Sequence, residues 1–127
     1  YKINSSSQLI NLQEAVKIFV ANQSSIKRII GSRSHSNQTF DSWVNQNFPN
    51  SEIVQAGSSL KFCLIAEGAA DIYPRFGPTS EWDIAAGHII VNEAGGSVNT
   101  FKNIEITYNK KEDLLNPQFY AIGNYKI

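Results

Sequence analysis

The chain has 127 residues, of which 42% are hydrophobic and 17% charged, and its formal net charge is zero. This length and composition predict one globular domain, residues 1–127, with a single core and no room for a second domain. A chain without net charge has no broad attraction for nucleic acid or anionic lipid, so any recognition of phosphate must be local. No apolar run reaches the length of a membrane span, and we therefore expect a cytoplasmic protein without a transmembrane segment.

Apolar runs and helical periodicity alternate along the chain and predict its elements. We expect residues 1–27 to form an edge region that contains a strand at 16–20. The remaining elements are strands at 28–32, 52–56, 71–73, 104–108 and 119–122, and helices at 41–48, at 58–67 and from 82 to about 94. Strands that alternate with helices indicate an α/β fold, here a mixed β-sheet with helices on both faces. Cys63, the only cysteine, excludes an internal disulfide and is expected in the core.

The helix that begins near Trp82 carries the most informative pattern in the chain. Its apolar residues recur with helical spacing and predict one buried face, made of Trp82, Ala85, Ala86, Ile89, Ile90 and Ala94. Asp83 lies in the first turn, where free amides and the helix dipole favour negative charge. From the pattern alone, Asp83 is either a capping residue paired with Ser80 or a ligand for a cation that bridges to a phosphate.

Polar side chains follow three of the predicted strands, where ligands of α/β sheets bind. His35 closes a polar run after the strand at 28–32, and it is either a residue of a loop that faces a ligand or a surface residue. Gly57 and Ser58 open a helix with Lys61 one turn further on, which predicts either a phosphate site or an ordinary serine cap. Arg75 lies in a stiff, proline-flanked segment that would hold its guanidinium for bidentate contact with phosphate, or it is an exposed arginine.

These segments resemble a known family. The C-terminal signature of the inositol monophosphatase superfamily, a group of metal-dependent phosphatases, is similar to Trp-Asp-x-Ala-Ala-Gly at 82–87 followed by Glu-Ala-Gly-Gly at 93–96. Within the superfamily, residues 32–35, 57–63 and 66–79 resemble bisphosphate nucleotidases of the CysQ type, which remove the 3'-phosphate of adenosine 3',5'-bisphosphate. The similarity runs from about residue 28 to residue 119. An upstream glutamate and an Asp-Pro-x-Asp-Gly-Thr motif of the family are absent, so the chain resembles the C-terminal half of such an enzyme.

The resemblance implies a fold, a reaction and a set of site residues. The fold would be the C-terminal domain of the inositol monophosphatase fold, and the reaction would be Mg²⁺-dependent hydrolysis to AMP and phosphate. Asp83 would be a catalytic metal ligand that also contacts the substrate, and the other substrate-binding residues would be His35, Gly57, Ser58, Lys61 and Arg75. The remaining Mg²⁺ ligands would come from the missing N-terminal domain, so this chain alone should be nearly inactive. The alternatives are a relative of inositol monophosphatase or fructose bisphosphatase, and a nucleotide-binding module without catalysis.

Overall fold

The structure is a computed structural model that describes residues 2, 13, 15–32 and 38–125. Within these residues the chain forms three helices and five strands. The strands are β1 (Arg28–Ser32), β2 (Glu52–Ala56), β3 (Ile72–Arg75), β4 (Ser97–Thr100) and β5 (Phe119–Ile122). The helices are α1 (Gln38–Asn47), α2 (Leu60–Ala66) and α3 (Glu81–Glu93).

The strands form one mixed sheet in the order β2-β1-β3-β5-β4, which confirms the predicted fold class. β1 pairs with β2 and β3 in parallel, whereas β5 runs antiparallel to β3 and β4. Because β1, β2 and β3 run in the same direction, their carboxyl ends meet at one edge of the sheet. This edge is the one at which ligands of α/β sheets bind.

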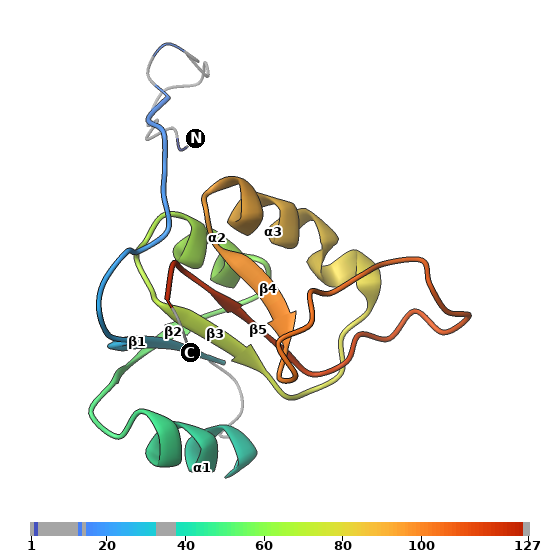
Figure 1. Ribbon diagram of the computed structural model, residues 1–127, viewed down its shortest axis with the longest axis horizontal. Coiled ribbons are helices and arrows are strands. Elements are labelled where there is room, and N and C mark those ends of the chain that lie inside the picture. The colour runs from blue at the N-terminus through green and yellow to red at the C-terminus, as the bar shows by residue number, and fades with distance from the viewer. Residues whose placement is uncertain (1, 3–12, 14, 33–37, 126–127) are drawn as a thin grey trace.

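Helices cover both faces of the sheet, so the molecule has three layers (Figure 1). α1 packs on one face, where Ile29, Val44, Ile72, Tyr120 and Ile122 form a buried cluster. α2 and α3 lie on the opposite face over the larger cluster, which includes Ile30, Phe62, Ile65, Val91 and Phe119. Gly87 lets the two helices meet, since a Cβ atom there would lie 2.5 Å from Cγ of Phe62.

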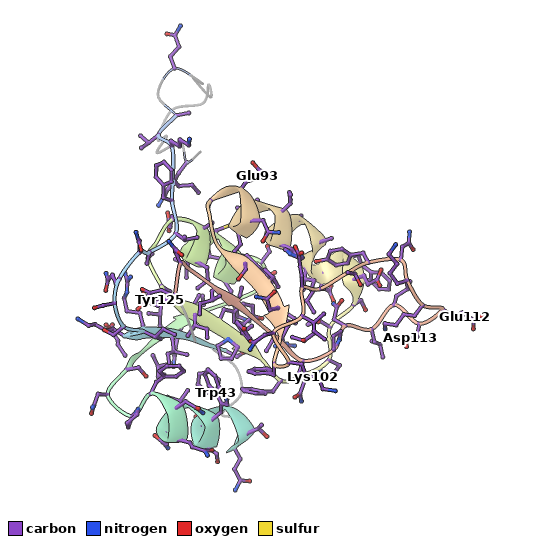
Figure 2. The ribbon with its side chains drawn as sticks, viewed as in Figure 1. Trp43, Glu93, Lys102, Glu112, Asp113 and Tyr125 are labelled. Atoms are coloured by element: carbon purple, nitrogen blue, oxygen red, sulfur yellow. The ribbon has the colours of Figure 1, made fainter. Side chains whose placement is uncertain are left out.

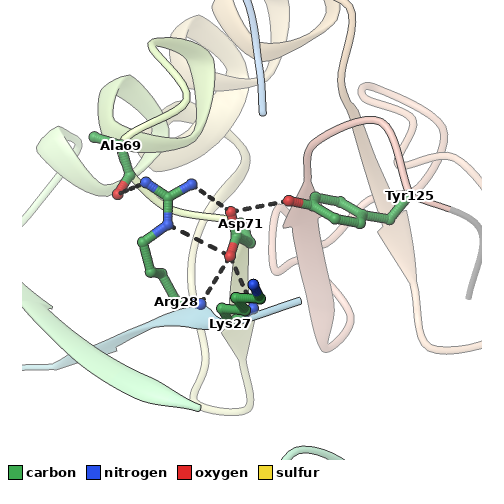
Figure 3. A network of polar contacts seen from close by, with 5 residues as sticks. All are labelled: Lys27, Arg28, Ala69, Asp71 and Tyr125. Carbon is green, nitrogen blue, oxygen red and sulfur yellow. Dashed lines mark hydrogen bonds and ion pairs between the residues drawn. The ribbon is translucent and has the colours of Figure 1, made fainter. Parts of the chain in front are cut away.

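A buried carboxylate joins three distant parts of the chain (Figure 3). Asp71 is 0% exposed and directly precedes β3. Its Oδ1 accepts hydrogen bonds from Nη2 of Arg28 at 2.6 Å and from the hydroxyl of Tyr125 at 3.0 Å. Its Oδ2 accepts from the backbone amides of Lys27 and Arg28. Burial opposes the charge, but these donors outweigh it and hold the pKa of Asp71 below its ordinary value.

Two predicted strands are wrong. In the segment 16–20, Val16 and Phe19 are 63% and 60% exposed. The amide of Val20 donates to the carbonyl of Ala94, just after α3, and not to a neighbouring strand. Residues 104–108 turn back along β4 but form only an isolated bridge, between Asn99 and Glu105. β4 itself was not predicted, because its short sequence of Ser, Val, Asn and Thr carries little apolar signal.

The predicted buried face of α3 is also wrong for this chain. Trp82, Ile89 and Ile90 are 69%, 54% and 41% exposed, and Ala85 and Ala86 are exposed as well. The helix instead buries its opposite side, which carries Ile84, Gly87, His88 and Val91, although Ala94 is buried as expected. Cys63 is exposed too, rather than in the core. Among the described residues, an apolar surface on the outer side of α2 and α3 is therefore exposed.

No helix among the described residues is long and apolar enough to cross a membrane.

Candidate functional site

A cavity of about 500 Å³ opens at the carboxyl ends of the three parallel strands. Each strand contributes a polar residue to its lining: Ser32 from β1, Gln55 from β2 and Arg75 from β3. Lys61 of α2 and Asp41 of α1 also line it, so groups from both faces of the sheet reach the same space. The apolar part of the lining includes Phe40, Ile53, Tyr73 and Phe76.

Lys61 is a buried cation in this cavity. It is only 6% exposed, and its ammonium lies 5.1 Å from the centre of the Tyr73 ring. No ion pair among the described residues includes Lys61. Burial lowers the pKa of Lys61, and the neighbouring charge of Arg75 lowers it further. Lys61 is therefore not a solvated surface lysine, and the geometry suits an anionic ligand.

Arg75 brings a second positive charge to the same lining. Its Nη2 donates to the carbonyl oxygen of Pro78 at 3.2 Å, which holds the guanidinium beside Gly77. Its Nε is buried without a hydrogen-bond partner among the described residues. A buried donor without an acceptor is costly, so an incoming oxygen would stabilise this group.

Aromatic stacking fixes the wall next to Arg75. The Phe76 ring stacks on Phe101 with ring centres 5.0 Å apart, and Trp43 of α1 contacts Phe76 edge-on at 5.8 Å. Trp43 lies between α1 and the sheet, as Figure 2 shows. Packed aromatic rings thus hold this wall of the cavity in place, which reduces the ordering cost of binding there.

Gly57 and Ser58 lie outside the lining of this cavity. They form the exposed turn between β2 and α2, and Ser58 adopts a left-handed conformation with φ of 49°. For this reason the helix begins at Leu60 rather than at Ser58, and Ser59 at its N-cap makes no side-chain capping bond. His35 lies outside the described residues, so its predicted role stays a prediction.

Asp83 lies at the start of α3 with an exposed side chain. Its Oδ2 accepts a hydrogen bond from the backbone amide of Ser80 at 2.8 Å, so Asp83 does act as a capping residue. No group of three or more His, Cys, Asp or Glu residues in the described part of the chain could hold a metal ion. Asp83 is not part of the lining that contains Lys61 and Arg75, and its predicted role as a metal ligand stays a prediction.

Several lining residues were missed in the sequence. Asp41 and Phe40 belong to α1, and the register of β1 with β2 sets Gln55 opposite Gly31. The position of Gln55 near the end of a predicted strand was an available signal. Nothing in the sequence indicated that α1 would contribute to the same cavity as Lys61.

Comparison with known proteins supports the resemblance found in the sequence. The model of the inositol monophosphatase family matches residues 3–122. A 3'(2'),5'-bisphosphate nucleotidase CysQ from Buchnera aphidicola is 47% identical over 107 residues, which cover 83% of this chain and 40% of the relative. The crystal structure of CysQ from Bacteroides thetaiotaomicron superposes with a TM-score of 0.78 at 39% identity, covering 91% of this chain and 44% of that one.

A more distant solved structure, an IMPase/NADP phosphatase complexed with Mg²⁺ and phosphate, shares the fold. Its TM-score is 0.64 at 17% identity, with 88% of this chain and 41% of that chain covered. This chain therefore spans less than half the length of each of these three proteins. The match over nearly all its residues and the identity to curated relatives lead to one conclusion: the chain belongs to the inositol monophosphatase family.

Proposed function

We propose that this chain is the substrate-side portion of a 3'(2'),5'-bisphosphate nucleotidase. The complete enzyme would hydrolyse the 3'-phosphate of adenosine 3',5'-bisphosphate and release AMP and phosphate. The observation that carries this proposal is the buried Lys61, which shares a cavity with Arg75 and has no carboxylate partner among the described residues. The 47% identity to a nucleotidase of this name supports the choice of substrate.

In this proposal Lys61 and Arg75 bind phosphate oxygens of the nucleotide. Two cations at the carboxyl ends of parallel strands attract a charged group, and a guanidinium can bind it through two parallel hydrogen bonds. Gly57 and Ser58 would contact the nucleotide from the turn before α2, and His35 from the segment after β1. In the complete enzyme these contacts would orient the substrate toward Asp83, which lies outside the lining of the cavity itself.

Asp83 is the group that we assign to Mg²⁺. A magnesium ion usually binds one or two carboxylates together with water and substrate phosphates, so a single exposed carboxylate at a helix N-terminus fits as one ligand. When bound, the metal would activate the attacking water and stabilise the leaving 3'-oxygen. That a solved structure with the same fold holds Mg²⁺ and phosphate supports the choice of Mg²⁺ as the metal.

The rest of the site would come from the portion of the family chain that lies outside this match. More than half the length of the Buchnera aphidicola relative lies there, since the chain covers 40% of it. The exposed apolar side of α3 supports the same view, because Trp82, Ala85 and Ala86 flank Asp83 and would be buried by that portion. We propose that the 127 residues alone bind nucleotide but release almost no phosphate.

A nucleotide-binding module without catalysis is the second candidate. The hydrogen bond from the Ser80 amide to Asp83 favours it, because capping of α3 gives this carboxylate a role without a metal. The two candidates share the Lys61 cavity and differ in whether Asp83 takes part in hydrolysis.

A chimeric enzyme separates these candidates. This chain would replace the matching segment of the Buchnera aphidicola relative, and phosphate release from adenosine 3',5'-bisphosphate would be measured with and without Mg²⁺. Mg²⁺-dependent release that disappears in the Asp83→Asn chimera supports the nucleotidase. A folded chimera that binds AMP without release supports the binding module, and a preference for inositol 1-phosphate points to the inositol monophosphatase alternative.

A further inference from the structure

The cavity at the carboxyl ends of the parallel strands has two chemically different ends. Lys61 and Arg75, from α2 and β3, form its cationic end. Phe40 and Asp41, from α1, lie where the helix on the other face of the sheet reaches the lining. No described cation lies within ion-pair distance of Asp41, so its carboxylate does not neutralise either basic residue.

Gly31 sets the shape of the α1 end. A Cβ atom at this position would lie 2.9 Å from Cγ2 of Ile53 and 3.4 Å from Cζ of Phe40. The two side chains therefore pack directly over the bare backbone of β1. Ile53 is 40% exposed and Phe40 is half-buried, so both keep apolar surface next to the cavity. An apolar surface that includes an aromatic ring suits a flat heterocycle.

Asp41 adds a hydrogen-bond acceptor next to this surface. Its side chain is exposed, lies in the first turn of α1, and follows Phe40 in the chain. An ionised carboxylate accepts hydrogen bonds and donates none, so it favours a ligand with an N–H group and disfavours one with a carbonyl oxygen at the same place. Inositol phosphates offer hydroxyl groups on a saturated ring, and they have no planar aromatic ring that could stack on Phe40.

We propose that Phe40 and Asp41 form the base subsite of this cavity. In this arrangement the base stacks on Phe40 and Ile53, and Asp41 accepts a hydrogen bond from an exocyclic amino group. The ligand class is a nucleotide with a 6-amino purine, whose phosphate lies at Lys61 and Arg75. A volume of about 500 Å³ falls within the usual range for small-molecule sites. The inference rests on the proposed function, because it takes the phosphate site at Lys61 as given.

The test compares AMP with IMP, which differ by an amino group against a carbonyl oxygen at C6. Dissociation constants for both nucleotides, and for inorganic phosphate, would be measured by NMR titration of the 127-residue chain. We expect AMP to bind at least about tenfold more tightly than IMP, since a hydrogen bond to a charged acceptor is lost and an oxygen faces the carboxylate. Asp41→Asn should bring the two constants within about threefold, because an amide can donate as well as accept.

Two further variants distinguish the contribution of the base to binding from that of the phosphate. Phe40→Ala should weaken the binding of AMP and IMP by a similar factor. The affinity for inorganic phosphate should stay within about twofold of the wild-type value. Lys61→Ala should weaken the binding of AMP, IMP and inorganic phosphate. Glu52→Gln removes a carboxylate at the opposite end of β2 and serves as the matched control for the loss of charge. Thermal unfolding of each variant checks that the fold is intact.

The outcomes distinguish this inference from the proposed function. If the ratio of the dissociation constants for AMP and IMP is the same in Asp41→Asn as in the wild type, and binding still depends on Lys61, the base subsite is wrong. The phosphate site is not contradicted by that result. Binding of neither nucleotide nor phosphate by the wild-type chain overturns both. A preference for AMP that collapses in Asp41→Asn and persists in Glu52→Gln supports the base subsite.

Discussion

The ammonium of Lys61 lies 5.1 Å from the centre of the Tyr73 ring, inside a lining that also contains Arg75. The aromatic face stabilises the charge, whereas burial and the arginine oppose it. Lys61 is thus a cation held in place mainly by packing. Its charge is the property on which binding of an anion at this site depends.

The pH dependence of nucleotide binding should reveal this lysine. Because its pKa is lowered, Lys61 loses its proton at a lower pH than the ordinary lysine value of 10.5. The affinity for AMP should therefore fall in the alkaline range before an ordinary lysine would titrate. Lys61→Arg should bind AMP with a flatter profile, because a guanidinium keeps its charge. Equal profiles for the two proteins would show that Lys61 does not bind the phosphate.

Loss of the Asp71 carboxylate should destabilise the fold strongly. Asp71→Ala leaves Arg28 without its ion pair and two backbone amides without their acceptor, so we expect the free energy of unfolding to drop by about 3 to 5 kcal/mol. Urea unfolding measures this change. The control is Glu112→Gln, which changes an exposed carboxylate in the 101–118 loop (Figure 2) and should alter stability by less than about 0.5 kcal/mol. A drop below about 1 kcal/mol in Asp71→Ala would contradict a structural role.

His88 should make the fold less stable in mild acid. It is 5% exposed, its Nδ1 lies 2.7 Å from the Tyr108 hydroxyl, and burial lowers its pKa more than the carboxylate of Glu105 raises it. The unfolded chain therefore takes up a proton near the ordinary value of 6.5 while the folded chain stays neutral. Stability is complete above that pH and is lost as the pH falls below it, by at most about 1.4 kcal/mol per pH unit.

Removing the titrating group checks this cause. His88→Gln keeps a neutral polar side chain, so its unfolding free energy should change less than that of the wild type between pH 7.5 and pH 5. The carboxylates titrate in both proteins, so their contribution to the pH dependence cancels in the comparison. If the two pH profiles run in parallel, His88 is not the group responsible.

The structural and catalytic roles of Asp83 should separate. Asp83→Asn keeps an oxygen that can accept a hydrogen bond from the amide of Ser80. The free energy of unfolding should therefore change by less than about 1 kcal/mol. In the chimeric enzyme the same change should reduce kcat by several orders of magnitude. A variant with near wild-type turnover would remove Asp83 from the metal site.

The outer side of α3 should tolerate polar residues in this chain. Ile89 is 54% exposed and lines a groove of about 650 Å³ with Leu60 and Cys63. Ile89→Gln should shift stability by less than about 0.5 kcal/mol here, yet it should weaken the folding of the chimera, in which we expect this face to be buried. Chemical unfolding of both proteins measures the contrast, and equal small effects would show that the face stays exposed in the longer chain.

Local patterns in the sequence predict much of the fold but not which helix face is buried. β1 and β2 begin and end where predicted, because short runs of apolar residues there are bounded by polar or turn residues. α3 is apolar around most of its circumference, with Ile84 and Val91 on one side and Ile89 and Ile90 on the other. Periodicity cannot choose between two such faces, because both are apolar and only tertiary packing decides which one is buried.

The candidate site divides in the same way. The motifs in the sequence single out Lys61 and Arg75, and the structure places both in the cavity lining, although Arg75 ends β3 instead of following it. Phe40 and Asp41 could not be predicted, because only the packing of α1 on the sheet brings them to the same lining. Residues that act together across two layers leave no pattern along the chain.

The hydrogen bonds of Asp71 also bear on the order in which the chain can fold. Its partners include Arg28 near the start of the sheet and Tyr125 close to the last residue. During synthesis the carboxylate can meet Arg28 well before Tyr125 has left the ribosome, and β5 completes the sheet equally late. Contacts between distant residues form slowly, so pairing of β5 with β3 and β4 should be a late step in the folding of this sheet.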